Sequence, residues 1–424
     1  MHSLKISGRI LATCLGLFSA SAIAEEGENH SDPGLSLPYG FYNEQFGFAA
    51  GWVEGRIGYP QPQATVLGTA MVGSEGSAMG FLMAQDLQIP GVDRLFIDPI
   101  VSFGYFDDAD TYISGNPDFT GERAGTNDSH ENNFVSGSGF DTFARVRFKY
   151  LLPMGHGRDQ IIPDYDVLEG FLYSGATGGA SWNPLESGRS FIELRPFYRS
   201  QEVDGDHADE NLRTNGFDLA YFWDNRDFPI NPSRGNALTL KMSRDFGALN
   251  STDSWTVLQA ELDAYHDFGE SDWFRSQVLA LDFWTADTPS WDESGGDIDH
   301  RAPAYTGATL GGLWRMRGYP SQRFNDRSAI YYSAEFRLTP RWNPFDAWPV
   351  VQEHLGVEWI QIVPFVEVGR VADSYDLSKL HSDMKWDAGI GLRAWVKGFV
   401  LRIDTAVSSE DFGIQMMIGQ PFQF

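Results

Sequence analysis

The C-terminal end of the chain is the feature that most restricts its fold. Between residues 412 and 424 the even positions are apolar except at Gln420, whereas the odd positions are mostly small or polar. A period of two places successive side chains on opposite faces of a β-strand. A strand of about ten residues with one apolar face can cross an outer membrane at a tilt. We therefore expect the chain to end in a transmembrane β-strand.

The same alternation recurs along the chain and predicts an all-β fold. No stretch after the N-terminus approaches the roughly 18 continuous apolar residues of a transmembrane helix. Aromatic residues make up 14% of the chain and it has 45 glycines, which suits strands with a lipid-facing side and aromatic girdles. We expect a sixteen-stranded antiparallel transmembrane β-barrel. The expected strands are 46–57, 63–72, 78–87, 95–106, 140–151, 167–175, 191–201, 216–224, 237–245, 254–265, 273–284, 330–338, 359–370, 386–396, 399–408 and 412–424.

The N-terminus has the layout of a secretory signal peptide. Lys5 and Arg9 precede an apolar run, and the small-x-small tripeptide 22–24 follows it. Cys14, in a loose lipobox, leaves a lipoprotein signal as an alternative. It is the only cysteine, so a processed chain could form no disulfide. We expect a signal peptide at 1–24, a short periplasmic segment at 25–45 and the barrel at 46–424.

Charge and motif content exclude several classes of function. The net charge of −27 argues against nucleic acid as a partner, because phosphate binding requires basic surfaces. Acids concentrate in the loops 107–131 and 287–299; solvated loops explain them, and cation bridging to lipopolysaccharide is the alternative. Neither a nucleophile elbow nor a metal-spaced histidine cluster is present, so we expect no enzyme, cofactor or metal. His266 beside a serine is the weakly supported catalytic alternative.

One loop and the two strands after it carry a specific set of residues. Gly311-Gly312 precedes Arg317-Gly318-Tyr319, and the next strands carry Glu335 and Glu367. This set resembles the lid-loop lock of the BamA/TamA-like bacterial surface antigen superfamily. The resemblance implies that an extracellular loop folds into the barrel lumen and that its Arg317 pairs with both acids. A buried guanidinium needs such carboxylate partners to offset its desolvation. Glu367 departs from the family, which usually has Asp there.

The resemblance also extends to function. It implies a weakly paired seam between the first and last strands, which we place at Gly47, Gly419 and Pro421. We expect membrane remodelling or transport of lipid or small solutes at this seam, in contact with outer-membrane lipids and lipopolysaccharide. A passive pore or structural barrel plugged by its lid is the alternative. Phe422 and Phe424 resemble the sorting signal that the barrel-assembly machinery reads during biogenesis. The oligomeric state is left open.

Segment lengths add two expectations. The stretch between Glu25 and Phe46 is too short for a POTRA domain, the periplasmic module through which assembly and secretion relatives receive clients. If the strand 46–57 rises from the periplasm, the lid connection 285–329 is extracellular and the acidic insert 107–139 is periplasmic. Periplasmic connections are usually short, so either the insert is a periplasmic element or a strand before it is miscounted.

Overall fold

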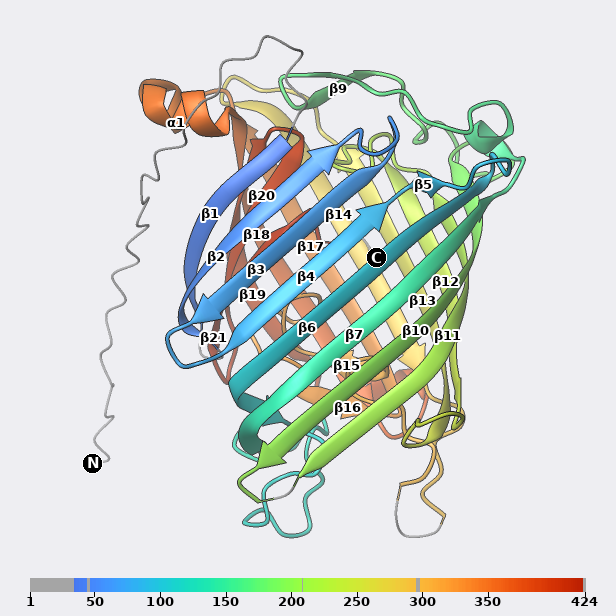
Figure 1. Ribbon diagram of the computed structural model, residues 1–424, viewed down its shortest axis with the longest axis vertical. Coiled ribbons are helices and arrows are strands. Elements are labelled where there is room, and N and C mark those ends of the chain that lie inside the picture. The colour runs from blue at the N-terminus through green and yellow to red at the C-terminus, as the bar shows by residue number, and fades with distance from the viewer. Residues whose placement is uncertain (1–33, 44–45, 208, 295–297, 422–424) are drawn as a thin grey trace.

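The computed structural model describes residues 34–43, 46–207, 209–294 and 298–421, and its main element is a large antiparallel sheet that curves into a barrel (Figure 1). Each strand pairs with the next strand of this sheet along the chain, except that β4 and β5 both pair with β6. The strands of this sheet are β1 (Gly34–Asn43), β2 (Gly47–Ile57), β3 (Thr65–Gly73), β4 (Ala78–Gln85), β5 (Leu87–Gln88), β6 (Leu95–Thr111), β7 (Val135–Leu151), β10 (Arg189–Gly205), β11 (Glu210–Asp224), β12 (Gly235–Phe246), β13 (Ser254–Asp267), β14 (Phe274–Asp287), β17 (Ser328–Pro340), β18 (Val357–Ala372), β19 (Lys385–Val396), β20 (Phe399–Val407) and β21 (Phe412–Ile418).

The expected all-β antiparallel barrel is confirmed. The sheet has 17 strands, and β5 continues β4 along the same neighbour, β6. The sheet therefore has sixteen successive positions. The expected strands overlap fifteen of them, and β1 is the one they miss.

Two strand predictions were wrong: one strand of the sheet was missed, and one predicted strand does not belong to the sheet. The predicted number of strands is therefore unchanged. Gly34–Asn43, expected in a periplasmic segment, forms β1 and pairs with β2 along its whole length. Conversely, the expected strand 167–175 is a small separate hairpin of β8 (Asp166–Leu168) and β9 (Phe171–Ser174). Its turn residues Glu169 and Gly170 both have positive φ, of 49° and 72°, so the chain reverses there instead of continuing as one strand.

The side-chain pattern is apolar outside and polar inside. Large apolar residues such as Leu240, Val366 and Ile390 are exposed on the outer face, although they lie in the middle of the sheet. Charged residues such as Glu193 and Arg337 are buried on the inner face. This inversion of the usual soluble pattern is typical of a barrel whose outer surface contacts lipid.

The two ends of the barrel carry different segments (Figure 1). The lid end holds the connection 288–327 with its short pair β15 (Ala308–Leu310) and β16 (Phe324–Asp326), and α2 (Leu377–Leu380). The opposite end holds η1 (Gly155–Arg158), the β8–β9 hairpin, η2 (Pro344–Ala347) and α1 (Pro349–Leu355). No helix in the described ranges is both long and apolar enough to span a bilayer.

The added strand β1 also reverses the expected side of the acidic insert. Residues 112–134 contact the lid directly. The backbone N of Asn325 donates to the Gly125 carbonyl at 2.7 Å, and Arg123 pairs with Asp326 at 2.6 Å. The insert therefore lies at the lid end. Its length no longer conflicts with the short connections expected at the periplasmic end.

Candidate functional site

The lid turns sharply where it enters the barrel. Gly311 and Gly312 have φ of 112° and 93°, and Met316 has φ of 62°, all in the left-handed region that favours glycine. The Gly311 amide N donates to the Arg315 carbonyl at 2.9 Å, and Tyr319 N donates to the Met316 carbonyl at 3.0 Å. These turns direct the Arg317 side chain toward the strands that follow, and only 1% of Arg317 is exposed.

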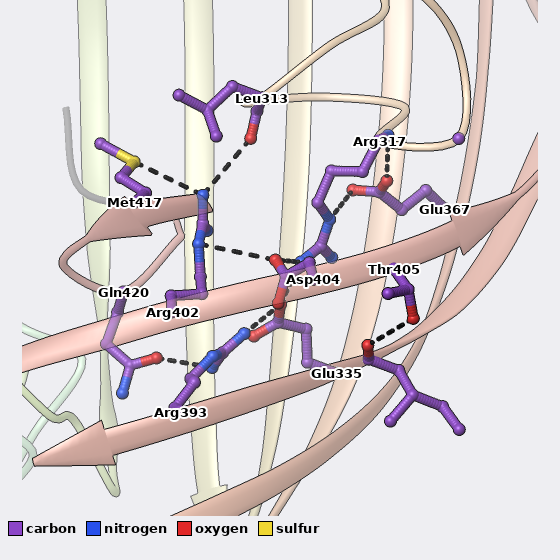
Figure 2. Close-up of polar contacts among 12 residues, drawn as sticks. Leu313, Arg317, Glu335, Glu367, Arg393, Arg402, Asp404, Thr405, Met417 and Gln420 are labelled. Atoms are coloured by element: carbon purple, nitrogen blue, oxygen red, sulfur yellow. Dashed lines mark hydrogen bonds and ion pairs between the residues drawn. The ribbon is translucent and has the colours of Figure 1, made fainter. Parts of the chain in front are cut away.

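Arg317 contacts carboxylates from three strands (Figure 2). Its Nη1 lies 3.0 Å from Glu335 Oε1 on β17 and 2.5 Å from Asp404 Oδ2 on β20. Glu367 on β18 binds it twice, through the backbone N at 2.6 Å and Nε at 3.2 Å. The Arg317 guanidinium carbon also lies 3.5 Å from the centroid of the Phe365 ring, a favourable cation–π position. The structure thus brings Arg317, Glu335 and Glu367 together and adds Asp404.

The three carboxylates control the protonation of Arg317. Desolvation by burial would lower the pKa of its guanidinium, but the charges of Glu367, Asp404 and Glu335 outweigh this and hold the pKa well above its ordinary value. Arg317 is therefore a fixed cation. A fixed cation surrounded by acids orders a loop but has no proton to exchange.

Further arginines of the inner wall complete the network. Arg337 donates through Nε and Nη2 to Glu335 Oε2, both at 3.0 Å, and Arg393 Nη2 donates to Glu335 Oε1 at 2.7 Å. Arg402 Nε lies 3.5 Å from Asp404 Oδ2. Glu335 and Asp404 therefore each have more than one cation near them, whereas Glu367 is bound by Arg317 and by the Tyr331 hydroxyl. These partners offset the cost of removing the charges from water.

Gly318 and Tyr319 bring the lid against the last strands of the barrel. The Gly318 amide N donates to Asp387 Oδ2 at 3.1 Å, and a Cβ on Gly318 would lie 2.7 Å from the Asp387 Cβ. Tyr319 Oη donates to the Trp386 carbonyl at 3.1 Å. Gly318 is required here for close approach. Asp387 is, like Asp404, a contact that the sequence analysis did not identify.

The acidic insert covers the lid from outside. Arg323 of the lid donates through Nη2 to the Ser129 carbonyl at 2.6 Å, and its Nε pairs with Glu410 Oε2 at 2.6 Å. Asn127 Nδ2 donates to the Asp383 carbonyl at 3.2 Å. The lid is therefore held between the inner wall and the insert.

The seam between the first and last strands has a different construction. Across the described residues no backbone pairing joins β1 to β21. Apolar side chains connect the two sides instead: Leu35 and Leu37 of β1 belong to one cluster with Phe399 of β20 and Ile418 of β21. Contact at the seam is thus made by packing and not by a hydrogen-bond ladder.

The three residues predicted at the seam, Gly47, Gly419 and Pro421, do not lie between the first and last strands. Gly47 begins β2, so the prediction that it marks the first strand was wrong, because β1 precedes it. Gly419 extends the ladder toward β20, since its amide N donates to the Val400 carbonyl at 2.7 Å. Pro421 is buried three residues after the end of β21. Phe422 and Phe424 lie outside the described residues, as does the expected signal peptide.

The catalytic alternative gains little from the structure. His266 and Ser181 line the same surface pocket. The His266 ring packs edge-to-face on Phe268 at 4.8 Å between ring centroids. In the part of the chain that the structure describes, no hydrogen bond links His266 to a serine, so the pair lacks the geometry of an activated nucleophile.

Comparisons with known proteins agree with this architecture. Residues 173–422, more than half of the chain, match the Omp85 superfamily domain. CdiB from Escherichia coli has a similar structure, with a TM-score of 0.54 at 10% identity over 91% of this chain and 61% of that chain. CdiB from Acinetobacter baumannii (TM-score 0.49, 12% identity, 91% and 59% coverage) and a BamA from Haemophilus ducreyi lacking POTRA domains 1–3 (0.45, 11%, 92% and 69%) also match.

The family match and the Escherichia coli CdiB structure support the fold and leave the activity open. The chain spans about 60% of the length of the two CdiB chains, and no curated protein matches its sequence. The resemblance seen in the lid residues is nevertheless confirmed by the family match over β9 to β21. The chain therefore belongs to the Omp85 superfamily and is an outer-membrane β-barrel.

Proposed function

We propose that the protein acts on its membrane at the seam between β1 and β21, where it remodels the bilayer or moves lipid or small solutes. One observation carries this proposal: within the described strands, every neighbouring pair of the sheet has a backbone ladder except β1 and β21. Each ladder hydrogen bond contributes about 0.5–1.5 kcal/mol. A seam without a ladder can separate at the cost of side-chain packing alone.

The residues beside the seam support lateral opening. Leu35, Leu37 and Ile418 are apolar, so lipid can replace their contacts with little loss. Pro38 in β1 has no backbone N–H to offer, and proline in a sheet is confined to edge strands, strand starts or bulges. The partners in this function are outer-membrane lipids, including lipopolysaccharide, at the outer face of the two strands.

A second candidate function rests on the lid. Arg317 and Met316 are almost completely buried inside the barrel, and the lid is fixed to three strands of the wall. This favours a barrel whose lumen is plugged, either as a gated pore or as a structural protein. In that case solutes would pass through the lumen and the seam would stay closed.

A disulfide across the seam distinguishes the two candidates. A cysteine at Leu37 of β1, whose side chain belongs to the same cluster as Ile418, is combined in turn with cysteines at Ile414, Met416 and Ile418 of β21. The pair that oxidises is used, since bridged Cα atoms must lie within about 7 Å. The matched control joins Leu37 to Val53, its direct partner on β2. Both proteins are reconstituted in liposomes, and lipid exchange between leaflets and leakage of a small dye are measured.

We expect the seam disulfide to abolish both activities and its reduction to restore them. The Leu37–Val53 disulfide should have no effect, because β1 and β2 are already joined by a ladder. Full activity in the oxidised seam variant would contradict the proposal and favour passage through the lumen. Equal loss in both variants would also contradict it, because the effect would then follow from stiffening β1 and not from closing the seam.

A further inference from the structure

Three acids on the inner wall are not used by the lid contacts of Arg317. Glu261 and Asp263 of β13 and Asp282 of β14 are buried, and one carboxylate oxygen of each lies within 4.8 Å of the others. Asp263 and Asp282 are direct partners across the two strands. We refer to these three residues as the acid triad.

The triad lacks enough positive charge for its burial. Arg315 of the lid pairs with Glu261 at 3.0 Å. The nearby Arg226 binds Asp224 through Nε and Nη2, at 2.7 and 2.8 Å. Within the described chain no hydrogen bond or ion pair reaches either oxygen of Asp282. Arg337, the other cation near Asp263, binds Glu335, so Arg315 is the one arginine that pairs directly with the triad in the described residues. Buried carboxylates are costly without a partner.

An independent feature also points to a ligand. Ser333 of β17 lies directly opposite Asp282 in the β14–β17 register, on the same inner face. Only 5% of Ser333 is exposed, and its Oγ has no hydrogen-bond partner. Buried polar groups normally have partners, so a buried hydroxyl that faces an equally unpartnered carboxylate points to a species that both oxygens bind.

We propose that the acid triad binds a divalent cation of the calcium or magnesium class, with Ser333 as a further oxygen donor. Such cations prefer carboxylate and hydroxyl oxygens, at about 2.3–2.6 Å for calcium. Two ligands at about 2.4 Å from one ion can be at most about 4.8 Å apart, which the triad satisfies. A divalent cation would also supply positive charge that the triad receives by direct pairing from Arg315 alone among the described residues. Because Arg315 holds Glu261, the ion would lie beside the lid.

Calcium titration of the whole purified barrel tests the site. After treatment with a chelator, binding of Ca²⁺ and of Mg²⁺ is measured by calorimetry for the wild type and for the double variant Asp263→Asn/Asp282→Asn. We expect one saturable site per chain in the wild type, with an affinity at least about tenfold lower in the double variant. The control Asp292→Asn/Glu293→Gln removes two exposed lid-end acids and should bind as the wild type does.

Thermal unfolding gives a second measurement. Ca²⁺ should raise the Tm of the wild type, because it binds the folded state, and should leave that of the double variant unchanged. Without the ion the double variant should be at least as stable as the wild type, since it has lost two buried carboxylate charges. Absence of saturable binding in the wild type would overturn the proposal and mean that the acids share a proton. Loss of binding in the exposed control alone would overturn it as well.

Discussion

The lid wall and the seam are adjacent regions of one barrel that are held together by opposite means. The lid wall, which we define as β17 to β20, binds Arg317 with three buried carboxylates and joins each strand to the next by a ladder. At the seam, β1 and β21 contribute apolar side chains to one cluster with β20, without a ladder between them in the described residues. Buried charge networks are specific in geometry, whereas apolar contacts tolerate sliding and exchange with lipid. The ion pairs of the lid wall therefore fix one arrangement of its strands, whereas the apolar contacts of the seam allow its two strands to move relative to each other.

The two regions are nevertheless connected through the lid. A Cβ on Gly413 of β21 would lie 2.3 Å from the Arg317 carbonyl oxygen, so the lid backbone passes directly over the last strand. Arg323 of the lid pairs with Glu410, just before β21. The lid is thus anchored on the wall and rests on one side of the seam. Any change in lid position should therefore alter β21 before it alters the rest of the barrel.

Removing the central cation should give the largest effect. Arg317→Ala leaves Glu335, Glu367 and Asp404 without their shared partner, and breaking a buried ion pair from one side costs about 3–5 kcal/mol. We expect a lower Tm and faster proteolysis of the lid, measured by heat-dependent gel mobility and limited digestion. The control Arg327→Ala removes a partly exposed arginine of the same loop and should cost less than about 1 kcal/mol. Equal protease resistance in both variants would show that Arg317 does not hold the lid.

A smaller change at the junction should affect the seam through the lid. Gly413→Ala places a methyl group against the Arg317 carbonyl, and overpacking of this kind costs about 1–3 kcal/mol. We expect the lid or β21 to shift, detected as faster hydrogen exchange in β21 while β18 stays protected. Gly80→Ala is the matched control, because a Cβ there has no neighbour within 4 Å. Identical exchange in β21 for the two alanine variants would mean that the lid and the seam are independent.

The sequence predicted the barrel because the alternation that defines it is local. Each strand shows its lipid-facing side chains without reference to its neighbours. β1 was missed because the face that should point to lipid carries Gly34, Ser36, Pro38 and Gly40 instead of large apolar residues. Its pattern is therefore not that of a membrane strand, although its pairing is complete. The 167–175 hairpin was misread for the opposite reason, since its two short strands and turn together have the length of one strand.

The contacts of Arg317 could be predicted only in part, for a physical reason. Glu335 and Glu367 lie on the two strands that follow the lid, so proximity along the chain suggests them. Asp404 reaches Arg317 from β20, and this requires the register of every strand between them. Alternation on 399–408 does place Asp404 on the inner face, but it cannot say which cation it meets.

The smallest expected effect comes from adding one donor to the seam. Pro38→Val gives β1 a backbone N–H, and one new hydrogen bond would contribute about 0.5–1.5 kcal/mol. Proline in a sheet avoids the paired side of a strand, so we expect the new N–H to face β21 and to slow hydrogen exchange there. Ser36→Val is the control, because Ser36 lies on the same exposed face of β1 and its substitution adds apolar area without a donor. Slower hydrogen exchange in β21 for Pro38→Val alone would show that a missing donor keeps the seam without a ladder. Equally slowed exchange in both variants would show instead that apolar packing limits closure of the seam. The seam and the lid wall would then differ in their side chains and not in their backbone donors.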